Sequence, residues 1–384
     1  MPISFSDKIE WAVRGWAIGD ALWLPLEIRN KEEIAMILTW DSSTYLPVKH
    51  HKLIMKDIDT IDAFDGESRG IFSDDTIFSM AGMQSISEKW KIDLQHLFDT
   101  HKSLFDKYGP YWFGSRTRDK FKKYTMWDNI ATLQNDSYTN WVLMKQFPYA
   151  AYLSAWIKQA WNKDVDFDIT DHILQTTDNT IASITASTHN TPIAKLTSLF
   201  HNKVLLYLLD TQPENLDMKT CLSNLLSIAS HWESMVWITE ETIKENPDSY
   251  MRITPILEKL LVQQDAINQG KPYSYQQIID TYLVKLDETE NPNINQTMKP
   301  WFHVASTFGL VYWCFLQDQN FNWLLNAIRI WYDTDSQWAI IGNMIWALHG
   351  PFYTQNYIDG LQHKKDIQET LNNFQQALQK DLPL

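Results

Sequence analysis

The chain has 384 residues and a formal net charge of −14 at pH 7. That charge argues against nucleic acid as a partner, because proteins that bind the phosphate backbone gather Lys and Arg on one surface. The 12 glycines are about 3% of the chain, against a usual share of roughly 7%. This composition disfavours turn-rich all-β architectures, so we expect a helical protein.

Cysteine usage and hydropathy bear on the compartment. Cys221 and Cys314 have neither a C-x-x-C spacing nor a ligand spacing with histidine, so neither a disulfide framework nor a structural zinc is predicted. The first residues carry acids and a helical pattern where a signal peptide needs an apolar core. The longest weakly polar stretch, Val304 to Leu316, is too short to span a bilayer. We expect a cytoplasmic monomer that does not contact a membrane.

The first predicted helix begins near Asp7, which forms a capping-box pattern with Glu10. An apolar stripe at helical spacing follows, made of Ile9, Val13, Trp16 and Ala17. Asp20 falls on the same stripe. An acid on an apolar face is either a hydrogen-bonded core residue or part of a site, and both readings stay open here.

Residues 41–70 carry many acids and are expected to form a solvated surface loop. A buried helix is predicted from Thr76, with Ser73 at or near its N-cap. Further amphipathic segments lie near 88–107, 140–160, 180–210, 219–245, 250–268, 275–285, 299–316, 323–332 and 339–348. Alternating strand patterns are lacking, so the fold class predicted is all-α, with residues 1–384 in a single domain.

Two acid clusters about 260 residues apart point to a function. They are Ser73-Asp74-Asp75-Thr76 and Asp333-Thr334-Asp335-Ser336, and each opens an apolar segment. Either cluster alone is what helix capping would select. Together they offer four carboxylates and flanking hydroxyls, which are ligands that suit Mg²⁺ or Mn²⁺. Two ions about 3.5–4 Å apart are therefore predicted.

Six segments follow one another in a recognisable order. The first is Gly15-Trp16-Ala17-Ile18-Gly19-Asp20-Ala21-Leu22, continued by Pro25 and Glu27, and the second is Gly70-Ile71-Phe72-Ser73-Asp74-Asp75-Thr76. The others are Gly114-Ser115-Arg116-Thr117-Arg118, Asn140-Trp141-Val142-Leu143-Met144-Lys145 with Pro148, Thr188-His189, and Asp333-Thr334-Asp335-Ser336. They span roughly residues 15–350 and in this order resemble the ADP-ribosylglycohydrolase family, which includes the dinitrogenase reductase-activating glycohydrolases.

The resemblance implies an orthogonal all-α fold with a binuclear Mg²⁺ or Mn²⁺ site in a cleft that binds ADP-ribose. The implied metal ligands are Ser73, Asp74, Asp75, Asp333, Asp335 and Ser336. Catalysis is assigned to Asp74, Asp75, Asp335 and Glu27, the last corresponding to a mobile-loop glutamate. Asn140 and His189 are expected along the ribose and diphosphate. The implied reaction removes ADP-ribose from a modified protein side chain or cleaves a related ADP-ribosyl small molecule.

Large aromatic residues replace glycines of the family pattern. Trp23, Trp141 and Trp331 flank motifs that should touch ligand, and Trp141 and Trp331 are counted among the substrate-binding residues. Bulky side chains either repack into the core or reshape the cleft. The alternatives to a glycohydrolase are a catalytically weak member that binds ADP-ribose or a partner protein, and a metal phosphohydrolase on the same scaffold.

Overall fold

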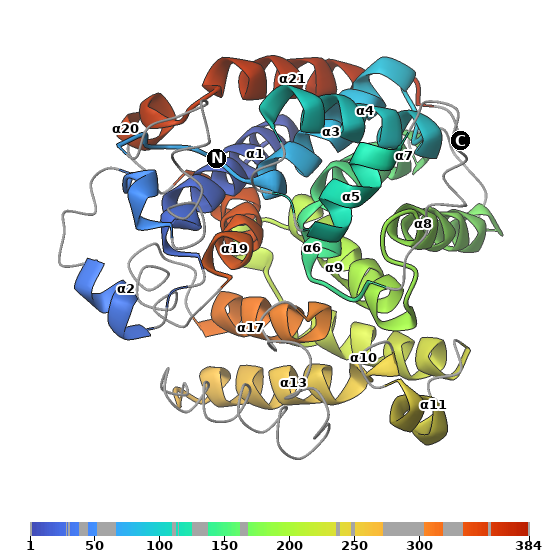
Figure 1. Ribbon diagram of the computed structural model, residues 1–384. Coiled ribbons are helices and arrows are strands. Elements are labelled where there is room, and N and C mark those ends of the chain that lie inside the picture. Colours follow the sequence, from blue (N-terminus) through green and yellow to red (C-terminus); the bar gives the residue numbers. More distant parts are fainter. Residues whose placement is uncertain are drawn as a thin grey trace.

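The computed structural model describes residues 2–27, 29, 31–37, 45–51, 67–109, 113, 115–124, 137–161, 168–235, 239–246, 250–271, 303–317, 333–351 and 355–382. Over these residues the protein is all-α, as predicted, and strand-like pairing is limited to isolated bridges such as Pro47 with Arg69. Figure 1 shows helices crossing one another at steep angles.

The helices follow one another along the chain with short turns of 3₁₀ helix between some of them. The N-terminal half contains α1 (Phe5–Trp23), η1 (Leu24–Leu26), α2 (Lys31–Ile37), η2 (Val48–His50), α3 (Asp74–Lys89), α4 (Leu94–Tyr108), α5 (Ser115–Lys123), α6 (Trp141–Met144), α7 (Phe147–Trp161) and α8 (Asp168–Ala186). The C-terminal half contains α9 (Pro192–Asp210), η6 (Pro213–Asn215), α10 (Met218–Met235), α11 (Glu240–Glu245), α13 (Thr254–Asn268), α17 (Val304–Gln317), α19 (Thr334–His349), α20 (Gln355–Gly360) and α21 (Lys364–Leu378).

Helices α1 and α19 pack along each other at backbone contact, near the centre of Figure 1. A methyl group on Gly15 would lie 2.7 Å from the carbonyl oxygen of Gly342, and one on Gly342 would lie 2.6 Å from that of Gly15. A methyl on Gly19 would lie 2.5 Å from the carbonyl oxygen of Trp338. Only glycine permits this approach, which brings the C-terminal turn of α1 beside the N-terminal turn of α19.

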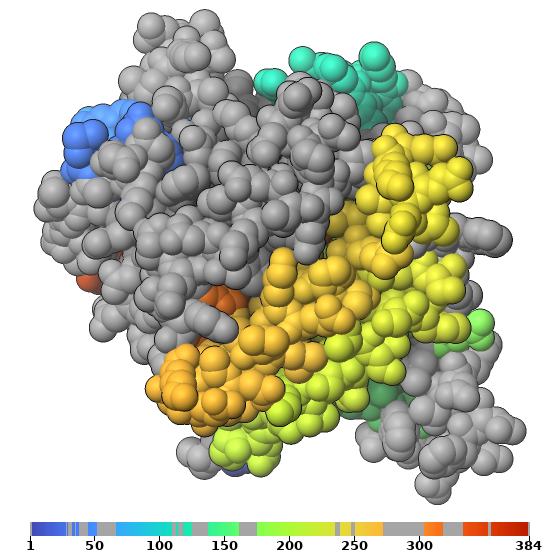
Figure 2. All heavy atoms as spheres, turned by 90° about the horizontal axis from the view of Figure 1, so that it is seen from below, coloured from blue at the N-terminus to red at the C-terminus, as the bar shows by residue number. Residues whose placement is uncertain are grey.

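Other helices surround this central pair. α3 packs against α4 and α21, and α7 packs against α9. On the opposite side, α10 and α13 lie side by side across the face shown in Figure 2. α17 lies between α13 and α19, so that the paired helices are covered there as well. Their central position explains why Asp20 and Asp335, on α1 and α19, are almost fully buried.

Most predicted helices correspond to one or two observed helices. The segment predicted near 180–210 is split at residues 187–191, where Thr188 and His189 lie between α8 and α9. The segments near 275–285 and 323–332 lie outside the described residues, as does Trp331. A single domain over residues 1–384 stays a prediction.

The expectation of a solvated loop is wrong for residues 45–51. Tyr45, Leu46, Val48 and His51 are all at most 3% exposed. The hydroxyl of Tyr45 donates to the carbonyl of Tyr357 at 3.0 Å. The apolar side chains bury this short piece. Of the acids that suggested solvation, Glu67 is exposed, and Asp57, Asp59, Asp62 and Asp65 lie outside the described residues.

Candidate metal centre

The two predicted acid clusters meet in space, and two more acids join them. Carboxylate oxygens of Asp20, Asp75 and Asp335 lie within 4.8 Å of one another, and a second group of the same kind contains Glu27, Asp333 and Asp335. We call these five side chains, together with the neighbouring Asp74, the acid cluster. Asp335 belongs to both groups and links them.

Asp20 fixes the start of α3. Its two carboxylate oxygens each accept a hydrogen bond of 3.0 Å from the backbone N–H of Ser73. The backbone N–H and the hydroxyl of Thr76 also donate to Asp20, at 3.1 and 2.6 Å. A carboxylate at this position satisfies backbone donors that a helix leaves unpaired at its N-terminus. Both readings of Asp20 therefore apply, since it is a hydrogen-bonded core residue that also faces the acid cluster.

Ser73 is the N-cap of α3, as predicted, and its hydroxyl accepts from the backbone N–H of Asp75 at 3.1 Å. Asp333 takes the equivalent position at the start of α19, with Asp335 in the first turn. Ser336, in the first turn of α19, is buried, and its hydroxyl partly offsets the rise that burial causes in the pKa values of Asp75 and Asp333. The two helix starts thus meet at the acid cluster, where Asp75 and Asp335 approach each other.

Burial raises the pKa values of the five aspartates in the acid cluster. The pKa of Asp20 rises to about 6 and that of Asp333 to about 7, in both cases mainly because burial penalises the charged form. The pKa values of Asp74, Asp75 and Asp335 are also raised, first by burial and then by neighbouring carboxylates. Ionised together, these groups would repel one another strongly.

The donor set fits a pair of hard cations. Asp75 Oδ2 and Asp335 Oδ1 are buried and have no hydrogen-bond partner among the described residues. A buried carboxylate oxygen without a partner is costly, and a divalent cation would both satisfy it and neutralise the repulsion. The oxygen-only ligands suit Mg²⁺ or Mn²⁺. Two groups that share Asp335 match a two-ion arrangement.

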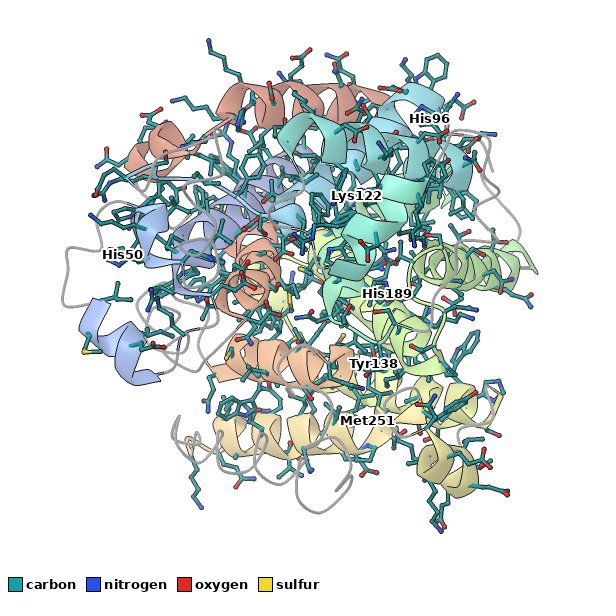
Figure 3. All side chains as sticks on the ribbon, in the orientation of Figure 1. His50, His96, Lys122, Tyr138, His189 and Met251 are labelled. Carbon is teal, nitrogen blue, oxygen red and sulfur yellow. The ribbon has the colours of Figure 1, made fainter. Side chains whose placement is uncertain are left out.

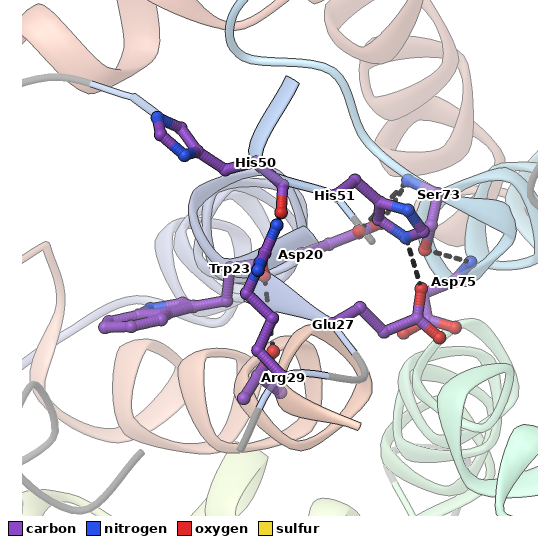
Figure 4. A network of polar contacts seen from close by, with 9 residues as sticks. Asp20, Trp23, Glu27, Arg29, His50, His51, Ser73 and Asp75 are labelled. Atoms are coloured by element: carbon purple, nitrogen blue, oxygen red, sulfur yellow. Dashed lines mark hydrogen bonds and ion pairs between the residues drawn. The ribbon is translucent and has the colours of Figure 1, made fainter. Parts of the chain in front are cut away.

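Glu27 and His51 form one edge of the centre. Glu27 follows η1 and is partly exposed, with 20% of its side chain accessible. Its Oε2 lies 2.8 Å from Nε2 of His51, whose side chain is 3% exposed. Figure 4 shows this contact and the bonds from Ser73 to Asp20. His51 carried no signal in the sequence, because it lies outside every motif, in the stretch expected to be solvated.

Asn140 and Trp141 form another edge. The amide of Asn140 donates to Asp333 Oδ2. The indole N–H of Trp141 donates to Asp74 Oδ2 at 3.0 Å, and its ring packs edge-on against Phe78 with centroids 3.8 Å apart. Trp141 thus touches the acid cluster directly. Its role in binding substrate stays a prediction.

Trp23 differs from Trp141. It is 2% exposed and stacks on Trp338 with ring centroids 5.2 Å apart, and Figure 4 shows it pointing away from Glu27 and Asp75. The stacking on Trp338 is a contact within the hydrophobic core. At this position the larger side chain is therefore accommodated by repacking and does not narrow the metal centre.

His189 lies beside Trp141 in the interior of the molecule (Figure 3), with ring centroids 5.5 Å apart. Its Nε2 is 2.8 Å from the hydroxyl of Thr139, and its Nδ1 is 2.9 Å from that of Thr188. Burial, followed by the charge of Lys145, lowers the pKa of His189 well below its usual range. The ring is therefore neutral at physiological pH, and it is linked to the acid cluster through Trp141.

The family follows from a match along nearly the whole sequence. The profile described as ADP-ribosylglycohydrolase matches residues 1–382. The chain belongs to the ADP-ribosylglycohydrolase family. Members are in general hydrolases that act on ADP-ribosylated substrates.

A solved structure has the same fold as this ADP-ribosylglycohydrolase family member. It is described as an ADP-ribosylglycohydrolase-related protein complex, with a TM-score of 0.53 and 13% sequence identity over 97% of this chain and 99% of that chain. This likeness supports the fold alone. No curated protein matches the sequence. Among the described helices, none combines the length and apolar character needed to cross a membrane.

Proposed function

We propose that this protein is a metal-dependent hydrolase that removes ADP-ribose from a modified protein side chain or cleaves a related ADP-ribosyl conjugate. The observation that supports it is the pair of unpartnered, buried oxygens on Asp75 and Asp335 inside a cluster of acids. We propose that Mg²⁺ or Mn²⁺ ions are held by Ser73, Asp74, Asp75, Asp333, Asp335 and Ser336, with Asp20 and Glu27 adjacent.

The bound metal would supply an activated water and orient the ribose hydroxyls. Cleavage at ribose C1 passes through an oxocarbenium-like transition state, which nearby carboxylates stabilise electrostatically. We assign proton transfer to Glu27, because it is partly exposed and its Oε2 lies 2.8 Å from Nε2 of His51. Asn140 and Trp141 hold Asp333 and Asp74 in orientation through their donated hydrogen bonds. His189, whose ring nitrogens bond to Thr139 and Thr188, would lie beside Trp141 along the part of the site that holds the ribose or diphosphate.

The proposal is tested by metal-dependent release of ADP-ribose from a panel of proteins modified on arginine, serine or other acceptors. The protein is first stripped with a chelator and then supplied with Mg²⁺ or Mn²⁺. We expect release that requires metal and that Asp335→Asn abolishes. Release by the stripped protein at the full rate, or equal release by the variant, would contradict the proposal.

A second candidate is a binding protein with weak catalysis, and the indole of Trp141 favours it. This side chain stands where the family pattern has a small residue, and its N–H occupies one oxygen of Asp74. Metal-dependent binding of free ADP-ribose without turnover of any modified protein would select this candidate over the hydrolase.

A further inference from the structure

Glu27 is held among like charges that should drive it away. One oxygen of its carboxylate lies within 4.8 Å of a carboxylate oxygen of Asp333 and of Asp335. Glu27 lies in a turn at the end of η1 and is partly exposed. A glutamate with this freedom would rotate into water to reduce the repulsion. Something must therefore hold it toward the acid cluster.

The contact that does so comes from His51. Among the described residues, His51 is the side chain that hydrogen-bonds the Glu27 carboxylate, through its Nε2. Hydrogen bonds to ionised groups are stronger than those between neutral groups. Figure 4 shows the imidazole directly beside the carboxylate.

His51 is itself held firmly. Its backbone N–H donates to the carbonyl of Val48 at 2.8 Å, closing η2. The N–H of Val48 in turn donates to the carbonyl of Ser68 at 2.8 Å, and Pro47 forms an isolated bridge with Arg69. Residues 67–70 lead directly into the start of α3, where the predicted metal ligands begin. The imidazole is thus positioned by the same stretch of chain that positions Asp74 and Asp75.

A second contact joins the two segments. The guanidinium of Arg29 donates from Nε to the backbone carbonyl of His50, and it lies 3.8 Å from the carboxylate of Glu33. The turn that carries Glu27 is therefore attached to residues 50–51 at two points, through the Glu27 carboxylate and through Arg29. Both contacts restrict the direction in which Glu27 can point.

We propose that His51 is a positioning residue for this centre, which holds the Glu27 carboxylate against the acid cluster and so completes the site. The inference rests on the proposed function for its catalytic consequence, since Glu27 matters to turnover only if the centre hydrolyses ADP-ribosyl bonds. The positioning itself is a property of the chain and is measurable without turnover.

The test compares His51→Leu, which removes the donor, with His51→Gln, whose amide N–H can take the place of the Nε2 donor. The matched control is His96→Leu, because Nε2 of His96 lies 3.0 Å from a carboxylate of Glu88 in a similar pair. His96 lies far from His50 and from η2 in Figure 3. Glu27→Gln and the double variant with His51→Leu complete the set.

Two measurements are made on each variant. In the metal-free protein, hydrogen exchange is followed at the backbone amides of residues 24–29 and 45–51. In the reloaded protein, Mn²⁺ affinity is measured by calorimetry, and kcat and KM are measured on the best substrate of the panel. Loss of a group that orients a metal-site residue typically costs 10–100-fold in metal affinity or activity.

We expect His51→Leu to speed exchange at residues 24–29 and to lower kcat or Mn²⁺ affinity roughly 10-fold or more, with KM changed much less than kcat. His51→Gln should recover most of both effects, and His96→Leu should show neither. In the Glu27→Gln background, His51→Leu should have no further effect on kcat. If His51→Leu is too unstable to assay, the exchange rates, Mn²⁺ affinity and kcat of His51→Gln are compared with those of Glu27→Gln instead.

Wild-type exchange rates and Mn²⁺ affinity in His51→Leu would overturn the proposal, as would a loss in His51→Gln equal to that in His51→Leu. Absence of turnover in the wild-type protein would count against the proposed function alone. In that case the exchange and affinity measurements still decide the role of His51.

Discussion

Asp333→Asn tests whether the acid cluster stores electrostatic strain in the metal-free protein. Asp333 is buried, its pKa is raised to about 7 by burial and then by Glu27, and its Oδ2 accepts from Asn140. Asparagine has almost the same shape and keeps an acceptor oxygen for the Asn140 amide. The variant therefore removes the charge while leaving the packing and this hydrogen bond in place.

The sign and size of the effect follow from linkage. The folded-state pKa is above the unfolded value, so the folded state binds the proton more tightly, and stability falls as pH rises toward the folded pKa. With a folded value of about 7 against 3.8, the raised pKa of Asp333 lowers stability by about 4 kcal/mol at pH 8, about 2 kcal/mol at pH 5 and almost nothing at pH 3. At an unfolding entropy of about 2.1 cal/mol/K per residue, 4 kcal/mol corresponds to about 5 °C for 384 residues.

The assay is thermal unfolding after chelator treatment, followed at pH 5 and pH 8. We expect Asp333→Asn to unfold several degrees above the wild type at pH 8, with a smaller gain at pH 5. Adding Mn²⁺ should then stabilise the wild type more than the variant, since a ligand that binds only the folded state raises Tm by mass action. A variant that is less stable than the wild type at pH 8, or that responds equally to Mn²⁺, would refute the reasoning.

Three further predictions concern other parts of the centre. Asp335→Asn should remove most of the Mn²⁺-induced rise in Tm and lower turnover by orders of magnitude, because Asp335 belongs to both groups of acids. Trp141→Phe should abolish most of the change in tryptophan fluorescence on adding Mg²⁺ and ADP-ribose, since its indole N–H donates to Asp74. Gly15→Ala should lower the free energy of unfolding by roughly 1–3 kcal/mol or more. Its methyl would lie 2.6 Å from Trp346 Cγ and 2.7 Å from the carbonyl oxygen of Gly342.

Each of these has a control and a contrary result. For Asp335 the control is Asp359→Asn, at an exposed acid, and a wild-type Mn²⁺ response in the Asp335 variant would contradict the assignment. For Trp141 the control is Trp90→Phe, at a side chain that is 48% exposed. An unchanged fluorescence response in Trp141→Phe would show that this indole does not sense the ligand. For Gly15 it is Gly82→Ala, whose methyl would meet Pro148 at 3.1 Å, and equal effects of the two would contradict the close-packing argument.

The sequence was sufficient for the fold class, because helical periodicity is a local signal. It was also sufficient for the meeting of the two acid clusters, because the order of the motifs along the chain resembles that of a known family. It identified Asp20 as an unusual acid on an apolar stripe but could not say what it bonds, since its partners are backbone N–H groups more than 50 positions away. His51 could not be found at all. Its function depends on a turn that places it against Glu27, and no periodic pattern encodes that contact.

The same reasoning explains the tryptophans. Replacement of glycine predicted either repacking or an altered cleft. Trp23 stacks in the core, as repacking predicts, whereas Trp141 contacts Asp74, and an altered cleft at that position stays a prediction. Trp23 and Trp141 differ in the direction in which the side chain leaves the backbone. That direction depends on tertiary packing, so residue type alone could not distinguish the two.

The pairing of α1 with α19 has a consequence for synthesis. The hydroxyl of Thr334 donates to the carbonyl of Trp23, a contact across 311 positions. During translation, α1 therefore leaves the ribosome long before α19. Contacts between such distant segments form slowly, because a long loop must close before they are made. Until α19 has been synthesised, the glycine-lined face of α1 is uncovered, and such a face makes the partly folded chain prone to aggregation. Cellular yield should therefore depend on chaperones that shield this face until the acid-bearing end of α19 has been made.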